Sequence, residues 1–202
     1  MMKYSNLSQL ADKYELIIGS ASPRRIMLLE EAGVKFSQLI PEVDERNHKR
    51  LDPEAYAVWL AEQKALSFKD KFSEKQIILG CDTIVVLKDL ILEKPADEKD
   101  ALKILSTLSG HQHRVVTAIA LRYQDKIIKS GFETTQVFFN SVTSGQINDY
   151  IATGEPMDKA GAYGIQGMGA FLVDRIEGNL DNVIGLPRTL LDKFSGEILN
   201  SI

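Results

Sequence analysis

Ile17-Ile18-Gly19-Ser20-Ala21-Ser22-Pro23-Arg24-Arg25-Ile26 is the stretch of this sequence that says most about its fold. The apolar residues before Gly19 predict a short buried strand, and the small residues that follow break it. Ser22 followed by Pro23 is typical of a helix N-cap with proline at the first helical position. We therefore expect a strand that turns directly into a helix over residues 24–32.

Arg24 and Arg25 fall in the first turn of this predicted helix, where cations are disfavoured because the helix dipole already gives a positive potential. A bound anion would offset that cost. Free backbone N–H groups, the hydroxyls of Ser20 and Ser22 and the two guanidinium groups would together suit a polyphosphate. The alternative is an exposed helix start whose arginines pair with the nearby acids at residues 30–31.

The composition excludes two classes of partner. The chain has 202 residues with 44% hydrophobic content, enough to bury a core as one domain or as two closely joined lobes. Its formal net charge of −4 argues against a sequence-independent nucleic-acid binder, which depends on neutralising phosphates. No apolar run is long enough to span a membrane. We therefore predict neither a nucleic-acid nor a membrane partner.

The cysteine content and the N-terminal segment indicate the compartment. The single cysteine, Cys81, cannot form an intramolecular disulfide, which is typical of a reducing environment. Residues 1–14 are polar and lack the apolar segment of a signal peptide. We therefore expect a cytoplasmic protein.

Strands and helices alternate in the first half of the sequence, and a long β-hairpin follows in the second half. The predicted strands cover residues 16–18, 36–40, 76–87, 113–123, 126–140 and 170–176. The predicted helices cover residues 24–32, 52–68, 97–110, 143–151 and the segment from residue 187 onward. This order predicts a mixed, twisted α/β sheet with flanking helices in a single domain over residues 1–202. We expect two lobes with a cleft between them, where a ligand would bind.

Asp82 interrupts the apolar run of residues 76–87 immediately after Gly80-Cys81. Burying a carboxylate without a partner is costly, so this one either pairs with another group or performs chemistry. The structural alternative is an aspartate that accepts backbone N–H groups at a bulge. Lys94, in a proline-stiffened turn, is either a phosphate ligand or an ordinary surface lysine. Asp82 together with Glu45 could hold a divalent ion through oxygen ligands.

The segment of residues 159–169 is rich in glycine, which permits positive φ angles and close approach of the backbone to a ligand. Gln166 in this segment would present an amide that carries both a donor and an acceptor, as the edge of a nucleobase requires. The alternative is a tight loop packed on its neighbours.

Six motifs together resemble the Maf family of nucleoside triphosphate pyrophosphatases, in the same order and over nearly the whole chain. They are SASPRR (20–25), GCDTIV (80–85), EKP (93–95), SG (109–110), DKAGAYGIQG (158–167) and NVIGLP (182–187). The sequence is similar to the branch that acts on dTTP and UTP, because the branch that acts on 7-methyl-GTP carries other residues at the positions of Thr83 and Gln166. Cys81 stands where alanine is common in the family, and its small size predicts little effect.

The resemblance implies a pyrophosphohydrolase fold similar to that of the inosine triphosphate pyrophosphatases. It implies hydrolysis of dTTP and UTP to the monophosphate and pyrophosphate with a divalent cation, magnesium or manganese. The family's general base falls on Asp82, its specificity positions on Arg24, Thr83 and Gln166, and further cleft positions on Arg25, Glu45, Lys64 and Lys94. A homodimer, and a role in clearing modified nucleotides or in division arrest, are also expected from the resemblance.

From these positions we expect Glu45 and Asp82 to hold the metal against the triphosphate. Arg25, Lys64 and Lys94 are expected to bind its phosphates. In this interpretation Asp82 deprotonates the water that attacks the α-phosphorus.

Two rival functions stay open on the sequence alone. A non-catalytic nucleotide-binding regulator of cell division would keep Arg24, Arg25 and Gln166 but would not need Asp82. A phosphotransferase would usually need a P-loop, and the sequence contains no Gly-x-x-x-x-Gly-Lys-Ser/Thr motif. The enzyme is favoured because Asp82 occurs together with Lys94.

Other residues have structural interpretations. Cys81 is expected to pack as a small residue, because no histidine motif accompanies it. His111 and His113, two apart on a predicted strand, could face one way as metal ligands, but no third ligand is evident in the sequence. Tyr56 and Trp59 are expected to be core or subunit contacts.

Overall fold

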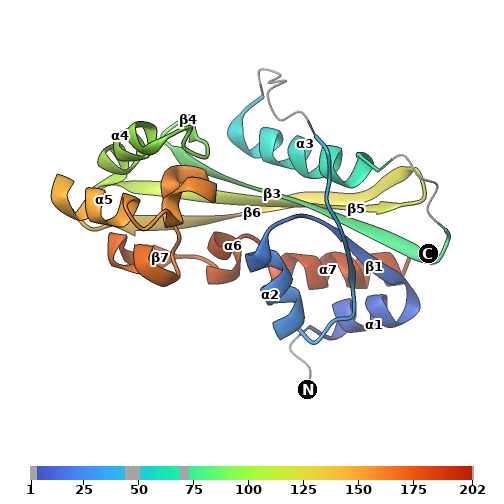
Figure 1. The fold of residues 1–202 in the computed structure, drawn as a ribbon. Coiled ribbons are helices and arrows are strands. Elements are labelled where there is room, and N and C mark those ends of the chain that lie inside the picture. The colour runs from blue at the N-terminus through green and yellow to red at the C-terminus, as the bar shows by residue number, and fades with distance from the viewer. Residues whose placement is uncertain (1–3, 44–50, 69–72, 202) are drawn as a thin grey trace. The chain divides into compact units, whose positions relative to one another are not determined.

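The computed structural model describes residues 4–43, 51–68 and 73–201, and the chain divides into two compact units. Unit 1 comprises the described residues within Met1–Asp82, Thr117–Glu133 and Gly185–Ile202. Unit 2 comprises Thr83–Val116 and Thr134–Ile184. Strands β3, β5 and β6, which Figure 1 labels, each contribute residues to both units.

The described strands form one mixed sheet in the order β2-β1-β3-β5-β6-β7, with β4 paired to β3. Their bounds are β1 Glu15–Gly19, β2 Ser37–Leu39, β3 Gln76–Leu87, β4 Leu90–Leu92, β5 Gln112–Tyr123, β6 Lys126–Phe139 and β7 Val173–Glu177. Strand β1 is parallel to β2 and β3, whereas β4 and β7 are antiparallel to their partners. The predicted mixed α/β sheet with flanking helices is confirmed, and the cleft stays a prediction.

Three of the described helices begin directly after a residue whose side chain caps them. Their bounds are α1 Ser5–Lys13, α2 Pro23–Glu31, α3 Pro53–Leu66, α4 Glu98–Leu108, α5 Ser144–Ile151, α6 Leu180–Ile184 and α7 Arg188–Leu199, with 3-10 helices η1 Glu155–Asp158, η2 Ala160–Ala162 and η3 Gly167–Leu172. The side chains of Asp52 and Asp97 accept N–H groups at the starts of α3 and α4. Thr143 and Gln146 form a capping box before α5. The predicted starts of these three helices are confirmed.

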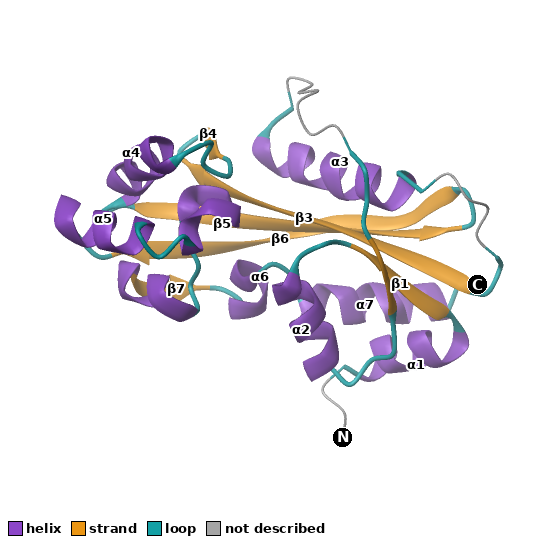
Figure 2. Cartoon of the chain, in the orientation of Figure 1, coloured by secondary structure: helices purple, strands orange, loops and turns teal. Residues whose placement is uncertain are grey.

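Within unit 1, helices cover both faces of the strands (Figure 2). Neighbouring residues of a strand point to opposite faces, and β6 shows this at residues 130 and 131. Ser130 Oγ donates to Glu62 of α3 at 2.6 Å, whereas a Cβ on Gly131 would lie 2.9 Å from the Phe194 ring of α7. Helices α3 and α7 therefore lie on opposite faces of β6.

Helix α1 packs against α7 and was not predicted from the sequence. Asp192 of α7 accepts the Leu7 N–H at 2.9 Å and the Asn6 side-chain amide at 3.0 Å. Leu7 and Leu10 are fully buried, three residues apart on one face of the helix. The pattern is too short and too polar around these leucines to indicate the helix by itself.

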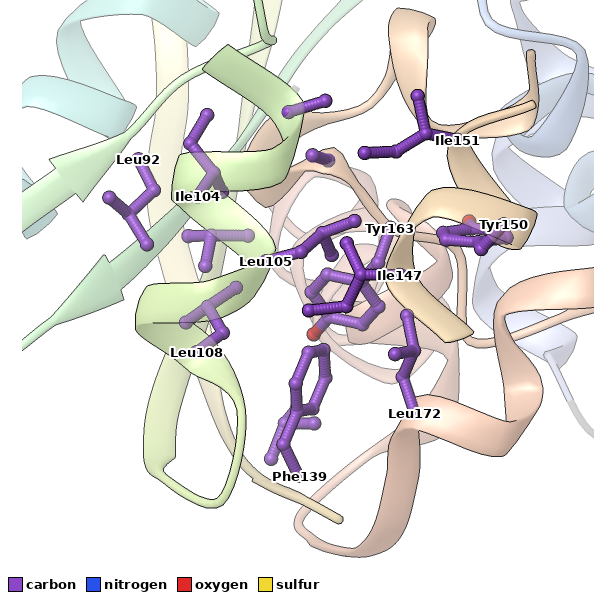
Figure 3. Packing of buried hydrophobic residues seen from close by; sticks show 14 of the residues in the cluster. Leu92, Ile104, Leu105, Leu108, Phe139, Ile147, Tyr150, Ile151, Tyr163 and Leu172 are labelled. Carbon is purple, nitrogen blue, oxygen red and sulfur yellow. The ribbon is translucent and has the colours of Figure 1, made fainter. Parts of the chain in front are cut away.

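Unit 2 has its own hydrophobic core, drawn in Figure 3. The labelled members are Leu92, Ile104, Leu105, Leu108, Phe139, Ile147, Tyr150, Ile151, Tyr163 and Leu172. Helices α4 and α5 contribute their apolar faces, and β6 contributes Phe139. Tyr163 and Phe139 meet edge to face with ring centroids 4.7 Å apart.

The predicted strand over residues 170–176 is wrong in its first half. Residues Gly167–Leu172 form η3, and β7 begins only at Val173. The backbone N–H groups of Met168 and Gly169 donate to the Glu155 carboxylate at 3.0 and 3.2 Å. These groups are therefore already hydrogen-bonded to a side chain before the strand begins. Helix α6 and the short strand β4 were also not predicted.

The two histidines do not form a common metal site. His111 is exposed and precedes β5, with its ring Nδ1 2.9 Å from the carbonyl oxygen of Ser109. His113 is buried, and its Nε2 forms a hydrogen bond with the Tyr163 hydroxyl at 2.8 Å. Among the described residues no hydrogen-bond partner reaches His113 Nδ1.

We predict that His113 makes stability depend on pH. Burial lowers the pKa of His113 from 6.5 to about 4, because a charged imidazolium would lie against the rings of Phe139 and Tyr163. The unfolded chain takes up this proton near pH 6.5 and the folded chain only near pH 4, so the free energy of unfolding falls as the pH is lowered through this window. The loss from this residue should reach roughly 3 kcal/mol below pH 4.

Urea unfolding of the wild type and of His113→Gln, measured from pH 7 to pH 4, checks this. The variant should lose less stability than the wild type over that range. Parallel curves for the two proteins would contradict the prediction.

Candidate functional site

The turn between β1 and α2 is built around the Ser20 hydroxyl. Ser20 Oγ accepts the Ser22 N–H at 3.2 Å and Arg25 Nη1–H at 3.1 Å. Arg25 is buried, and its Nε–H donates to the carbonyl oxygen of Gly185 at 2.8 Å. The guanidinium of Arg25 is therefore fixed by the turn and by residue 185, all within unit 1.

The first turn of α2 has the predicted N-cap residue but lacks the predicted side-chain cap. Ser22 occupies the N-cap position and Pro23 the first helical position, but the Ser22 side chain makes no capping hydrogen bond. The predicted capping role of the Ser22 side chain is wrong, and the position is confirmed. Glu31, one of the acids considered as an arginine partner, instead accepts Arg188 Nη1–H at 3.1 Å.

Strand β3 covers the predicted residues 76–87 and continues through the polar residues that interrupt its apolar run. Gly80 and Asp82, two residues apart, point to the same face of the strand, where α3 lies. A Cβ on Gly80 would lie 2.2 Å from the Ala61 carbonyl oxygen and 2.6 Å from the Ala65 nitrogen. Only glycine permits this close approach of the helix to the strand.

The close approach brings Lys64 of α3 onto Asp82. Lys64 Nζ donates to Asp82 Oδ1 at 2.6 Å, and their side chains are 12% and 8% exposed. A nearly buried carboxylate is thus paired with a cation rather than with backbone N–H groups at a bulge. Both residues were named from the sequence as site candidates, but it was not predicted that they form a pair.

Cys81 packs as a small residue, as expected. Its Sγ donates to the carbonyl oxygen of Gly185 at 3.3 Å. Burial raises the pKa of the Cys81 thiol, and the charge of Arg25 lowers it by a smaller amount. A buried thiol with a raised pKa has little thiolate at neutral pH, which argues against a nucleophilic role.

Three predicted site residues belong to unit 2, and each is described there. Thr83 follows Asp82 on β3 and is half-buried. Lys94 is exposed in a turn whose preceding residue, Glu93, accepts the Gly161 N–H through its carbonyl oxygen at 3.1 Å. This bond ties the Lys94 turn to the glycine-rich segment.

Gln166 stands at the start of η3 with an exposed side chain. In the part of the chain that the structure describes, no hydrogen bond to the Gln166 amide is recorded. The segment of residues 159–169 is not an irregular loop, because it contains η2 and the first part of η3. Positive φ angles occur at Gly161 and Gly167, as the glycine content predicted.

Glu45, the second predicted metal ligand, lies outside the described residues. Within residues 4–43, 51–68 and 73–201 no group of three or more His, Cys, Asp or Glu side chains has metal-binding geometry. Asp82 fits a Mg²⁺ ligand, because this ion is usually held by one or two carboxylates together with substrate phosphates. Lys64 would then share that carboxylate with the ion.

In the described ranges, no helix combines the length and the apolar character needed to cross a membrane.

Known proteins are similar to this chain over most of its length. A sequence model of the family described as Maf-like protein matches residues 15–196. A dTTP/UTP pyrophosphatase of Desulfitobacterium hafniense is 49% identical, over 85% of this chain and 80% of the relative. One from a Geobacillus species is 48% identical, over 86% of this chain and 92% of the relative.

A weak structural similarity is found to the nucleoside-triphosphatase / dITP/XTP pyrophosphatase of Mycobacterium abscessus. It has a TM-score of 0.44 and 12% identity, over 93% of this chain and 96% of that one. At that score the similarity supports no conclusion about the fold.

We predict that Lys64 and Asp82 are energetically coupled. Lys64→Met leaves a nearly buried carboxylate without its cation, which should cost about 2–4 kcal/mol of unfolding free energy. Adding Asp82→Asn in that background should recover part of the loss, because the unpaired charge is removed.

Urea unfolding of the two single variants and the double variant gives the coupling energy. The exposed pair of Lys129 and Glu197, treated in the same way, is the control and should show a smaller coupling. Additive losses at Lys64 and Asp82 would show that the ion pair does not contribute.

Proposed function

The chain belongs to the Maf family, and we propose that it hydrolyses dTTP and UTP to the nucleoside monophosphate and pyrophosphate. The relatives that are 48–49% identical carry this activity in their names, and they match most of this chain. The observation that carries the proposal is the pairing of Asp82 with Lys64 on the face of β3 that packs against α3. A carboxylate held in this way can direct a water molecule in a fixed orientation.

Asp82 is the proposed general base. It accepts a proton from the attacking water, and the water oxygen bonds to the α-phosphorus as the bond to the pyrophosphate oxygen breaks. A carboxylate of ordinary pKa is a weak base at neutral pH, so the attacking water must also be made more acidic. A divalent ion, magnesium or manganese, held by Asp82 and Glu45 would lower the pKa of this water when bound.

The phosphate groups are proposed to lie over the start of α2. Its first-turn N–H groups have no side-chain cap from Ser22, and Ser20 and Arg25 are already fixed by hydrogen bonds. Fixed donors cost little reorganisation when charge develops on the leaving pyrophosphate. Arg24 and the ammonium groups of Lys64 and Lys94 complete the proposed phosphate ligands.

Gln166 is proposed to read the base, with Thr83 and Arg24 as further specificity positions. Uracil and thymine share an N3–H donor flanked by two carbonyl acceptors, and the amide of glutamine complements one such donor–acceptor pair. The C5 methyl lies away from this edge, so both bases can be accepted. An unpaired polar group on a buried base edge would cost about 1–3 kcal/mol.

A non-catalytic nucleotide-binding regulator is the second candidate. It would need only the residues that bind the phosphates and the base, and not the general base Asp82. The Lys64–Asp82 pair favours the enzyme, because a nearly buried carboxylate close to bound phosphates would weaken simple binding.

We predict that Asp82→Asn lowers turnover by at least about 100-fold and retains triphosphate binding, because the amide cannot accept the proton. Pyrophosphate release from dTTP, UTP, CTP, ATP, GTP and modified triphosphates, with magnesium or manganese, measures the activity. Calorimetry with UTP measures the binding.

Cys81→Ala is the control and should keep turnover within about threefold of the wild type. Near-normal turnover of Asp82→Asn would remove Asp82 from the mechanism. A wild type that binds UTP but releases no pyrophosphate would favour the regulator.

A further inference from the structure

The carboxylate of Glu155 lies beside the segment that carries Gln166, and its two oxygens accept three hydrogen bonds. Oε1 accepts the Tyr150 hydroxyl at 3.0 Å and the Gly169 N–H at 3.2 Å. Oε2 accepts the Met168 N–H at 3.0 Å. Two backbone N–H groups that lie two and three residues after Gln166 are therefore bound to one side chain.

The residues before Gln166 are bound to the same pair of side chains. The Tyr150 hydroxyl, which donates to Glu155, accepts the Gly164 N–H at 3.2 Å. The backbone is thus held two residues before Gln166 and two and three residues after it. All of these groups belong to unit 2.

The glycines of this segment make room for Glu155 and Tyr150. A Cβ on Gly167, whose φ is +75°, would lie 3.0 Å from Glu155 Oε2. A Cβ on Gly169 would lie 2.6 Å from the Tyr150 hydroxyl and 2.5 Å from the Gly164 carbonyl oxygen. From the sequence, we expected these glycines to let a ligand come close to the backbone. At Gly167 and Gly169 the groups that come close are instead side chains of the protein itself.

The charge state of this cluster agrees with its hydrogen bonds. Burial raises the pKa of Glu155, but hydrogen bonds from Met168, Tyr150 and Gly169 and the charge of Lys159 outweigh it and leave the pKa below its usual value. Burial also raises the pKa of Tyr150, so its hydroxyl stays protonated. An ionised carboxylate can accept from all three donors at once.

We propose that Glu155 is a positioning residue for base recognition, which fixes residues 164–169 so that Gln166 presents its amide to the nucleobase in one orientation. The proposal rests on the proposed function, in which Gln166 reads uracil and thymine. With no recorded hydrogen bond to its own amide among the described residues, the orientation of Gln166 depends on the backbone that carries it. A site that is held in place before binding discriminates better than one that must be ordered by the ligand.

The test variant is Glu155→Gln, which keeps the shape of the side chain. Its amide nitrogen cannot accept a hydrogen bond, so the Met168 N–H or the pair of donors on the other oxygen loses its acceptor. The ratio of kcat/KM for UTP to kcat/KM for GTP should fall by about tenfold or more, through the UTP value. Asp149→Asn removes an exposed carboxylate on the same helix as Tyr150 and should leave the ratio unchanged.

A second experiment, in the Gln166→Ala variant, distinguishes a positioning role of Glu155 from a general loss of structure. In Gln166→Ala, adding Glu155→Gln should change the ratio by less than about twofold, because the residue through which Glu155 acts is gone. If Glu155→Gln does not fold, Tyr150→Phe removes only the hydroxyl that joins Glu155 to Gly164, and the ratio should fall in the same direction.

The outcomes are distinguishable. Three results would overturn the positioning role. The first is a UTP-to-GTP ratio of kcat/KM in Glu155→Gln that stays within about twofold of the wild type, and the second is an equal loss of kcat/KM for both nucleotides. The third is a fall in the ratio that Glu155→Gln still causes in the Gln166→Ala background. A wild type that releases no pyrophosphate from UTP would instead overturn the proposed function on which the role rests.

Discussion

The close approach of α3 to β3 at Gly80 is the constraint on which the proposed chemistry depends. The helix carbonyl of Ala61 occupies space that any Cβ at residue 80 would need. Because the helix lies so close, a lysine one turn further along reaches the carboxylate two residues further along the strand. Backbone packing therefore determines the distance between Lys64 and Asp82 and, with it, the orientation of the proposed base.

Unit 2 also contains glycines that permit a close approach, but there a side chain approaches the backbone. There a carboxylate, that of Glu155, occupies the space left by glycines, and the backbone closes around it. In both units a glycine is needed where main chain must approach another group more closely than a Cβ allows. In unit 1 the result is an ion pair between two site residues. In unit 2 it is a fixed backbone beside an exposed amide.

Most of the fold could be predicted from the sequence because its signals are local. Helix caps such as Asp52 and the long alternating strands of the hairpin depend on neighbours in the chain. Helix α1 and the first half of the 170–176 segment could not be predicted. Helix α1 is fixed by its contact with Asp192 of α7. Residues 170–172 belong to η3, which begins where two backbone N–H groups bond to Glu155. Local patterns contain no information on such partners.

The candidate site was predicted as a set of residues and not as an arrangement. Asp82 stood out as a carboxylate in an apolar strand, and the arginines stood out at a helix start. The partners of these residues depend on tertiary contacts, so the Lys64 ion pair and the carbonyl of Gly185 that holds Arg25 were not foreseen. Glu155 has one weak signal in the sequence: it directly follows Gly154, where α5 has ended, and it precedes the glycine-rich residues 159–169.

The central claim is that the protein directs water to the α-phosphorus of a nucleoside triphosphate. Hydrolysis of UTP in water labelled with oxygen-18, followed by mass spectrometry of both products, tests it most directly. Attack at the α-phosphorus puts the label in UMP and leaves the pyrophosphate unlabelled. Label in the pyrophosphate, or release of inorganic phosphate with UDP, would contradict the account.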